Sequence, residues 1–254
     1  MEKDNLKKTL GGFGANISNL FRNICDNLTH KANKMDNFSN FRSRIISGAT
    51  MLVVGVVAIY FSEDLFLLVL LALTILMAFE WLDITKTAPE EQKSKWNISG
   101  FFYILLPMFS AFKIRDNNPD ILLWMFAIIV ATDTFAYFAG KSFGGAKLAP
   151  TISPNKTWSG LAGGVVASMV IGFLSSFMFA GGIVFFILIS AILSVLEQVS
   201  DLLESKIKRI FGVKDSGSII PGHGGILDRF DGMVLVAPVV LMLVWLCSEN
   251  FIPQ

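Results

Sequence analysis

The residues best suited to chemistry lie between Ser205 and Asp231, where the sequence reads SKIKRIFGVKDSGSIIPGHGGILDRFD. This segment holds five of the chain's 21 lysines and arginines, one of its two histidines, five glycines and three aspartates. Glycines let backbone N–H groups approach phosphate oxygens, and carboxylates combined with phosphates are ligands that Mg²⁺ prefers. The segment therefore indicates a site for phosphates and a metal ion.

The charged residues of this segment have spacings that fit such a site. Asp228 and Asp231 are three residues apart at the expected start of the last helix, so both could face one divalent ion. The side chains that could neutralise phosphate charge are Lys206, Lys208, Arg209, Lys214 and Arg229.

Ionisable residues also interrupt the apolar runs, where they are expensive and usually mark function. Asp133 lies near the end of one run, and Tyr137 and Lys141 share its helical face. A structural Asp133–Lys141 pair is the alternative. A later run ends in a polar stripe formed by Glu197, Asp201, Glu204, Ser205 and Lys208. A solvated helix face would explain the later members of this stripe but not Glu197 and Asp201, because both follow directly on the apolar run.

A second loop, 140–160, is also rich in glycine and lysine. Lys141, Lys147 and Lys156, together with glycines and hydroxyls, are typical phosphate ligands. A bare basic loop would equally contact anionic lipid headgroups. The spacing leaves both interpretations open.

The elements that must position these residues are membrane helices. The chain is 53% apolar and only 16% charged, against about a quarter charged in a typical globular domain. We expect an all-α, polytopic integral membrane protein of about seven transmembrane helices, or more if apolar runs are broken. The runs are Ile45–Phe61, Leu65–Leu82, Ile98–Phe112 (short, with Pro107), Ile121–Ala139, Leu161–Ala180, Ile183–Val199 and Met233–Ile252.

The distribution of charge predicts the orientation. With the N-terminus in the cytoplasm and the C-terminus outside, 19 of the 21 lysines and arginines face the cytoplasm. Residues 1–41 are expected to be a hydrophilic cytoplasmic tail, and residues 42–254 a single transmembrane domain. The two cysteines, Cys25 and Cys247, show neither a disulfide framework nor a zinc spacing.

The segment from Ser205 to Asp231 resembles the C-terminal signature of the phosphatidate cytidylyltransferase (CDP-diacylglycerol synthase) family. The pieces K-L-A-P and S-P-x-K-T-W-x-G between Asp133 and Gly160 also resemble the family's upstream loop. The resemblance covers about residues 42–252. The signature is matched by Ser205, Ile207, Lys208, Arg209, Lys214, Asp215, Gly217, Ile220, Pro221, His223, Gly224, Gly225, Ile226, Asp228, Arg229 and Asp231.

The resemblance implies a CTP-dependent nucleotidyltransferase of the cell (inner) membrane whose active site faces the cytoplasm. CTP and phosphatidate would be its substrates and Mg²⁺ its cofactor, with a second cation and a homodimer left open and no nucleic acid expected. The implied metal ligands are Asp228, Asp231 and Asp201, with Asp133 and Asp215 as further candidates. The implied phosphate-binding residues are Lys214, Arg229, Ser205, Lys208, Arg209, Lys141, Lys156, Ser153, Gly224 and Gly225. His223 would contact phosphate or orient a carboxylate, and a structural role for it is the alternative.

Two other functions remain open at this point. A CTP-dependent lipid kinase of the polyprenol or phytol type would also be polytopic and basic on its cytoplasmic side. An ion-coupled transporter could use Asp133, Glu197 and Asp201 as an ion path, although no internal repeat typical of transporters is evident.

Overall fold

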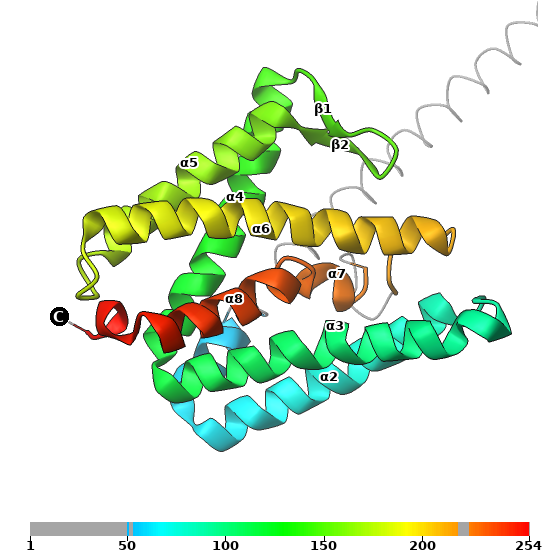
Figure 1. The fold of residues 1–254 in the computed structure, drawn as a ribbon, viewed down its shortest axis with the longest axis horizontal. Coiled ribbons are helices and arrows are strands. Elements are labelled where there is room, and N and C mark those ends of the chain that lie inside the picture. The colour runs from blue at the N-terminus through cyan, green and yellow to red at the C-terminus, as the bar shows by residue number, and fades with distance from the viewer. Residues whose placement is uncertain (1–49, 51–52, 218–223, 254) are drawn as a thin grey trace, which may run out of the picture. The chain divides into compact units, whose positions relative to one another are not determined.

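The computed structural model describes residue 50, residues 53–217 and residues 224–253. Within these ranges the regular structure is helical apart from one short hairpin (Figure 1). Residues 53–61 are helical. The elements that follow are α2 (Glu63–Thr85), α3 (Glu90–Asn117), α4 (Pro119–Phe143), β1 (Lys147–Ala149), β2 (Ser153–Thr157), α5 (Trp158–Ser175), α6 (Ile183–Ile210), α7 (Leu227–Phe230), α8 (Met233–Leu246) and the 3₁₀ turn η1 (Ser248–Phe251).

The helices α2 to α6 are long and apolar enough to cross a membrane, and α8 is a shorter apolar helix. This confirms the expected helical class, whereas the count of seven spans stays a prediction. α3 extends beyond the run predicted there and continues through Pro107, which is buried. Packing offsets the roughly 3 kcal/mol that an interior proline costs a helix. The predicted tail, 1–41, and His223 lie outside the described residues.

The loops between the helices gather at two opposite ends. At one end, the Arg209 side chain donates a hydrogen bond to the carbonyl oxygen of Ile152 in the hairpin (3.4 Å). At the opposite end, the Tyr60 hydroxyl donates to the Asp120 carboxylate (2.6 Å). Successive loops therefore alternate between the two ends, as a bundle of spanning helices requires.

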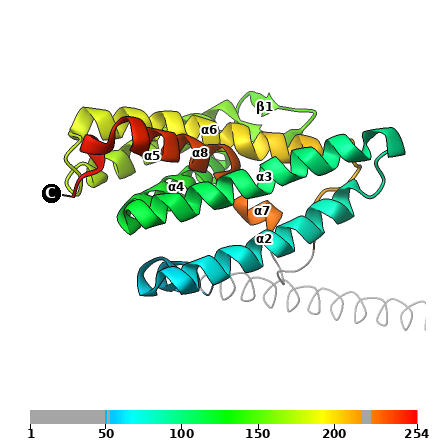
Figure 2. The same ribbon diagram turned by 60° about the horizontal axis from the view of Figure 1, so that its bottom comes forward.

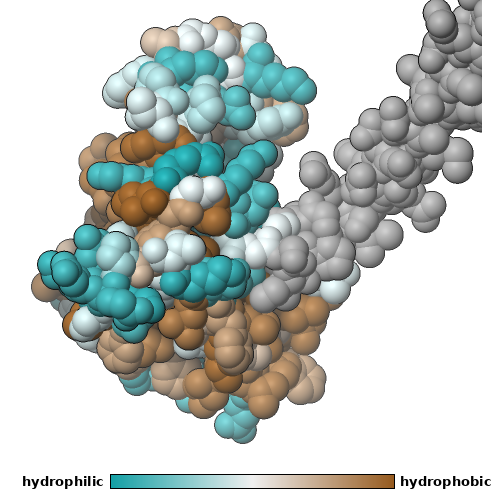
Figure 3. All heavy atoms as spheres, turned by 90° about the vertical axis from the view of Figure 1, so that its right-hand side faces the viewer, coloured by the Kyte–Doolittle hydropathy of each residue, from teal (hydrophilic) through white to brown (hydrophobic). Residues whose placement is uncertain are grey.

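The first of these ends, which we call the polar end, carries most of the charge. It is formed by segments 83–97, 140–160, 200–217 and 224–232, which together contain eleven lysines and arginines, whereas segment 113–120 at the other end contains two. Figure 3 looks onto the polar end and shows hydrophilic residues gathered there above a hydrophobic flank. This asymmetry sets the polar end apart as the place for an ionic site.

The helices form two groups with α7 and α8 between them. Figures 1 and 2 show α4, α5 and α6 in one group and α2 and α3 in the other. α8 packs against both α3 and α6, and the short α7 contacts α2. Because α7 carries Asp228 and directly precedes Asp231, both residues lie at the junction of the two groups.

Small residues hold α4, α5 and α6 close together. A Cβ atom at Gly160 would lie 2.8 Å from a carbonyl oxygen of α4, and one at Gly172 would lie 2.3 Å from a carbonyl oxygen of α6. In the same interior, the Thr132 hydroxyl lies 2.7 Å from that of Ser168 and donates to that of Ser194 (3.0 Å). Such close backbone packing is typical of helices in membranes, and it fixes the distance between the polar residues at the ends of α4 and α6.

The hairpin is a feature that the all-α prediction overlooks. β1 and β2 are antiparallel, with Lys147 opposite Thr157. The turn from α4 into β1 uses Gly144 and Gly145 with φ of 61° and 97°, a region that favours glycine. β2 leads directly into α5, whose first turn is capped where the Thr157 hydroxyl accepts the N–H of Gly160 (3.1 Å). The hairpin thus presents its lysines beside the helix ends.

Candidate active site

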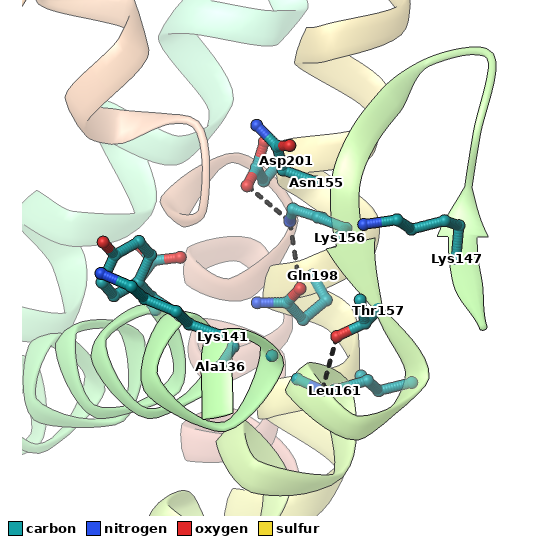
Figure 4. Close-up of a pocket in the computed structure, with 13 residues that line it drawn as sticks. Ala136, Lys141, Lys147, Asn155, Lys156, Thr157, Leu161, Gln198 and Asp201 are labelled. Carbon is teal, nitrogen blue, oxygen red and sulfur yellow. Dashed lines mark hydrogen bonds and ion pairs between the residues drawn. The ribbon is translucent and has the colours of Figure 1, made fainter. Parts of the chain in front are cut away.

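A pocket of about 480 Å³ opens at the polar end between the hairpin and the helices α4, α5 and α6 (Figure 4). It brings the lysines of loop 140–160 together with Asp133 and with Asp201 of the polar stripe on α6. Three lysines, from α4, β1 and β2, line it together with two aspartates. The lining residues are Asp133, Ala136, Tyr137, Gly140, Lys141, Lys147, Asn155, Lys156, Thr157, Gly160, Leu161, Gln198 and Asp201.

Lys156 connects the hairpin to α6. Its ammonium group lies 2.5 Å from the Asp201 carboxylate and donates to the side-chain oxygen of Gln198 (3.1 Å), as the dashed lines in Figure 4 show. The side chains of Lys156 and Asp201 are only 16% and 22% exposed. An ion pair this shielded from water is stronger than one on an open surface, so Lys156 is held at the boundary between the pocket and the carboxylates of α6.

Three carboxylates form a compact group beside the pocket. Asp201, Glu204 and Asp231 each place one oxygen within 4.8 Å of the others. The Ser205 hydroxyl donates to Asp201 (3.3 Å), and the backbone N–H of Gly232 donates to Asp231 (2.8 Å). Removal from water raises the pKa of Asp231 well above its usual value, and the neighbouring charges of Asp201 and Glu204 raise it further. Such mutual repulsion is what a bound cation would relieve.

Glu204 supplies a specific indication that a cation fits this group. Its side chain is 5% exposed, and one oxygen, Oε2, accepts a hydrogen bond from Lys208 (2.8 Å). The other oxygen, Oε1, is buried and has no hydrogen-bond partner among the residues that the structure describes. A buried oxygen without a partner is costly, and three carboxylate oxygens at this spacing suit a hard divalent cation.

Asp228 is linked to this group through Lys208 and also accepts hydrogen bonds from residues before α7. One of its oxygens accepts from Lys208 (2.6 Å), and the other accepts the N–H groups of Ser216 (3.0 Å) and Gly225 (2.9 Å). Burial alone would raise the pKa of Asp228, but these donors outweigh it and the pKa is lowered. Both carboxylate oxygens of Asp228 thus already accept hydrogen bonds from the protein, and a metal-binding role for Asp228 stays a prediction.

The other residues predicted for the site lie near the pocket or near the three-carboxylate group, with the exceptions named below. Asp133 lies close enough to the fully buried Glu197 for their carboxylates to interact, and the Arg229 charge acts on Asp133. Asp215 lines a separate pocket of about 210 Å³. Further positions are Lys214 (exposed), Arg209 (donating to Ile152 and Val213), Ser153 (first residue of β2), Gly224 (φ of 84°) and Gly225 (donating to Asp228).

Sequence reasoning proposed no role for two acidic residues that the structure places at the polar end. Glu204 was visible as part of the polar stripe, three residues after Asp201, and this spacing on one helix was the available signal. Glu80, an isolated carboxylate near the end of an apolar run, carried the same kind of signal as Asp133.

A helical membrane protein with a lysine-lined pocket next to three clustered carboxylates belongs to the class of membrane-embedded enzymes that act on phosphate compounds. Comparison with known proteins narrows this class. The chain belongs to the cytidylyltransferase family, whose model matches residues 102–247.

Relatives support this assignment along most of the chain. A phosphatidate cytidylyltransferase of Rickettsia felis is 39% identical over 215 residues, which are 80% of this chain and 92% of the relative. The protein of that name from Rickettsia typhi is 40% identical over 211 residues, covering 79% of this chain and 90% of the relative. The one from Brucella suis is 40% identical over 163 residues, covering 63% and 60%. The predicted family resemblance is confirmed.

Proposed function

We propose that this protein transfers CMP from CTP to phosphatidate, giving CDP-diacylglycerol and pyrophosphate. The family and the names of the relatives support a nucleotidyltransferase of this kind. The observation in the structure that carries the proposal is the lysine-lined pocket directly beside a three-carboxylate group. Positive charge is needed to reduce the repulsion between the two strongly anionic reactants, and it also stabilises the charge on the departing pyrophosphate.

In this proposal Asp201, Glu204 and Asp231 hold Mg²⁺, and the unpartnered Oε1 of Glu204 supports the fit. When bound, the ion supplies charge neutralisation at phosphate oxygens. A second cation and metal-binding roles for Asp133, Asp215 and Asp228 stay predictions.

The lysines of the pocket would position the phosphates. The phosphate of phosphatidate is already ionised near pH 7, so the reaction needs no dedicated general base and depends on placement and charge. Lys156 has a further donor capacity beyond Asp201 and Gln198, because an ammonium group has three N–H bonds. Lys141 and Lys147 line the same pocket. We assign these three residues to phosphate binding.

Replacing Lys156 with Met is expected to lower kcat/KM for CTP by about 10- to 100-fold, because it removes one phosphate ligand and leaves Asp201 without its partner. Steady-state kinetics in detergent micelles with CTP varied would measure this. Lys95→Met, an exposed lysine at the same end, is the matched control and should behave like the unmodified protein. Equal kinetics in the two variants would remove Lys156 from the site.

The proposed orientation puts the polar end in the cytoplasm, with seven spans, the N-terminus inside and the C-terminus outside. The eleven lysines and arginines of the polar end against two at the other support it under the positive-inside rule. CTP would then reach the pocket from the cytoplasm of the cell that carries the protein in its inner membrane, while the acyl chains of phosphatidate stay in the bilayer. A homodimer stays a prediction.

Purified protein in micelles with phosphatidate, Mg²⁺ and CTP labelled in the cytosine ring should place the label in the lipid fraction and release pyrophosphate. EDTA should abolish both, because the carboxylate group would lose its cation. A lipid kinase would instead leave the label in water as CDP when given a polyprenol. Folded protein that consumes no CTP under either condition would contradict the proposal and direct the search to transport.

A further inference from the structure

Glu80 is a buried carboxylate that lies outside both the pocket and the three-carboxylate group. It sits near the end of α2, and its side chain is 4% exposed. Within residues 53–217 and 224–253, none of the ion pairs includes it. A buried carboxylate needs donors in place of water, so the identity of those donors shows what Glu80 does.

Among the described residues, three hydrogen-bond donors reach Glu80, from Ser216 and from the start of α7. Its Oε1 accepts the backbone N–H of Ile226 (2.9 Å). Its Oε2 accepts the backbone N–H of Leu227 (2.8 Å) and the hydroxyl of Ser216 (3.2 Å). One side chain of α2 therefore holds both sides of the loop that precedes α7. Hydrogen bonds to an ionised acceptor are stronger than those between neutral groups.

Two glycines of this segment leave space for Glu80 and its partner Ser216. A Cβ atom at Gly217 would lie 2.6 Å from Glu80 Oε1, and one at Gly225 would lie 1.9 Å from Ser216 Oγ, 2.7 Å from the Gly217 backbone nitrogen and 2.8 Å from Glu80 Oε1. A side chain at either position would force these groups to shift. These two glycines thus leave space for a carboxylate of the protein itself, and a phosphate-binding role for Gly225 stays a prediction.

The same loop positions the carboxylates of the site. Ser216 gives its hydroxyl to Glu80 and its N–H to Asp228, so the two acids hold one residue from two sides. Leu227 directly precedes Asp228, and Asp231 follows three residues later within the metal group. The backbone at Ile226 and Leu227 therefore helps to set where Asp231 lies relative to α6, together with the Ser200 hydroxyl, which donates to the Asp231 carbonyl oxygen.

We infer that Glu80 is a positioning residue of the active site: it fixes the loop and α7 so that Asp231 completes the cation-binding group with Asp201 and Glu204. The inference rests on the proposed function and deepens it. Glu80 would touch neither substrate nor metal, and its action would pass through the backbone of residues 226–227 to Asp231.

Glu80→Gln tests the inference. Gln has nearly the same volume as Glu, but its amide NH₂ group would replace an oxygen that now accepts a backbone N–H of Ile226 or Leu227. Two donors would then face each other, so the backbone at these residues must shift. We expect the affinity for Mn²⁺, measured with the metal alone by electron paramagnetic resonance, to fall by about 10- to 100-fold. The Mg²⁺ concentration for half-maximal turnover should rise in parallel, with KM for CTP changed by less than about threefold, since the lysine pocket is untouched.

Glu63→Gln, at the exposed start of the same helix, is the matched control and should bind Mn²⁺ like the unmodified protein. A variant that merely contains less folded protein would show fewer Mn²⁺ sites of unchanged affinity, which separates instability from positioning. Unchanged Mn²⁺ affinity in Glu80→Gln would overturn the inference. Because Mn²⁺ binding needs no turnover, it tests Glu80 even if labelled CTP shows a different reaction.

Ser216→Ala provides a milder second variant in case Glu80→Gln does not fold. It removes one of the three donors to Glu80 and leaves the backbone N–H that Asp228 accepts. We expect a weakening of Mn²⁺ binding in the same direction, of about two- to fivefold, from the loss of one hydrogen bond. Mn²⁺ affinity equal to that of the unmodified protein would count against the inference.

Discussion

Asp231→Asn is expected to lower kcat by about 10³-fold or more, which corresponds to roughly 4 kcal/mol of transition-state stabilisation. Asp231 contributes one of three clustered carboxylate oxygens, and Asn replaces it with a neutral group of weaker affinity for a hard cation. The loss should persist at saturating Mg²⁺, since the remaining two carboxylates cannot restore the geometry. Turnover with labelled CTP across a Mg²⁺ titration is the measurement.

The fold should survive this substitution, because it removes repulsion between Asp231 and its acidic neighbours while the main-chain bonds remain. In particular, the Ser200 hydroxyl still donates to the Asp231 carbonyl oxygen. Asp116→Asn is the matched control: this aspartate pairs with Lys113 at the opposite end of the helices (3.1 Å) and is 43% exposed. Its turnover should stay unchanged. If Asp231→Asn kept more than a tenth of the normal turnover, Asp231 would not be a metal ligand.

The sequence predicts those features of the site that depend on neighbours within one element. Asp201 and Glu204 are three residues apart on α6, so their shared face follows from helical periodicity alone. Asp133 and Lys141 were placed on one face of a helix by the same rule, and both line the pocket. The charge asymmetry between loops likewise predicts the polar end, because the helices alternate in direction.

Features of the site that depend on contacts between different helices and loops could not be predicted from periodicity within one element. Periodicity predicts that Asp228 and Asp231 share one face at the start of the last helix, but the donors to Asp228 come from Lys208, Ser216 and Gly225, which only packing brings together. The carboxylate that lies within 4.8 Å of those of Asp201 and Asp231 is that of Glu204, and a metal-binding role for Asp228 stays a prediction. A local pattern shows which residues share a face and says nothing of what that face meets.

The short hairpin shows the same limit for backbone structure. Residues 147–157 are polar and lack the alternation of apolar residues that predicts a strand. The two strands form because the glycine turn after α4 and the start of α5 bring their ends together, with the N–H of Trp158 donating to the carbonyl oxygen of Ala146 (3.1 Å). The hairpin is a consequence of the helix packing that surrounds it.

Lys208→Met is expected to lower the free energy of unfolding by about 3–5 kcal/mol and to abolish most turnover. The Lys208 ammonium group bridges Glu204 (2.8 Å) and Asp228 (2.6 Å), and the three side chains are only 12%, 5% and 10% exposed. Removing it leaves two shielded carboxylates without their shared ammonium group: Glu204, a member of the three-carboxylate group, and Asp228, which accepts the N–H groups of Ser216 and Gly225. Thermal unfolding in detergent, followed by tryptophan fluorescence, would measure the loss.

The bridge also predicts how two substitutions combine. Asp228→Asn added to Lys208→Met removes one of the two carboxylates left unpaired, so the double variant should unfold at a temperature no lower than Lys208→Met alone. Additive losses would mean that Lys208 and Asp228 act independently. Lys206→Met, an exposed lysine two residues earlier on α6, is the matched control and should unfold like the unmodified protein. Because Lys208 pairs with both Glu204 of the three-carboxylate group and Asp228, stability and turnover should fall together here, whereas Asp231→Asn should lower turnover alone.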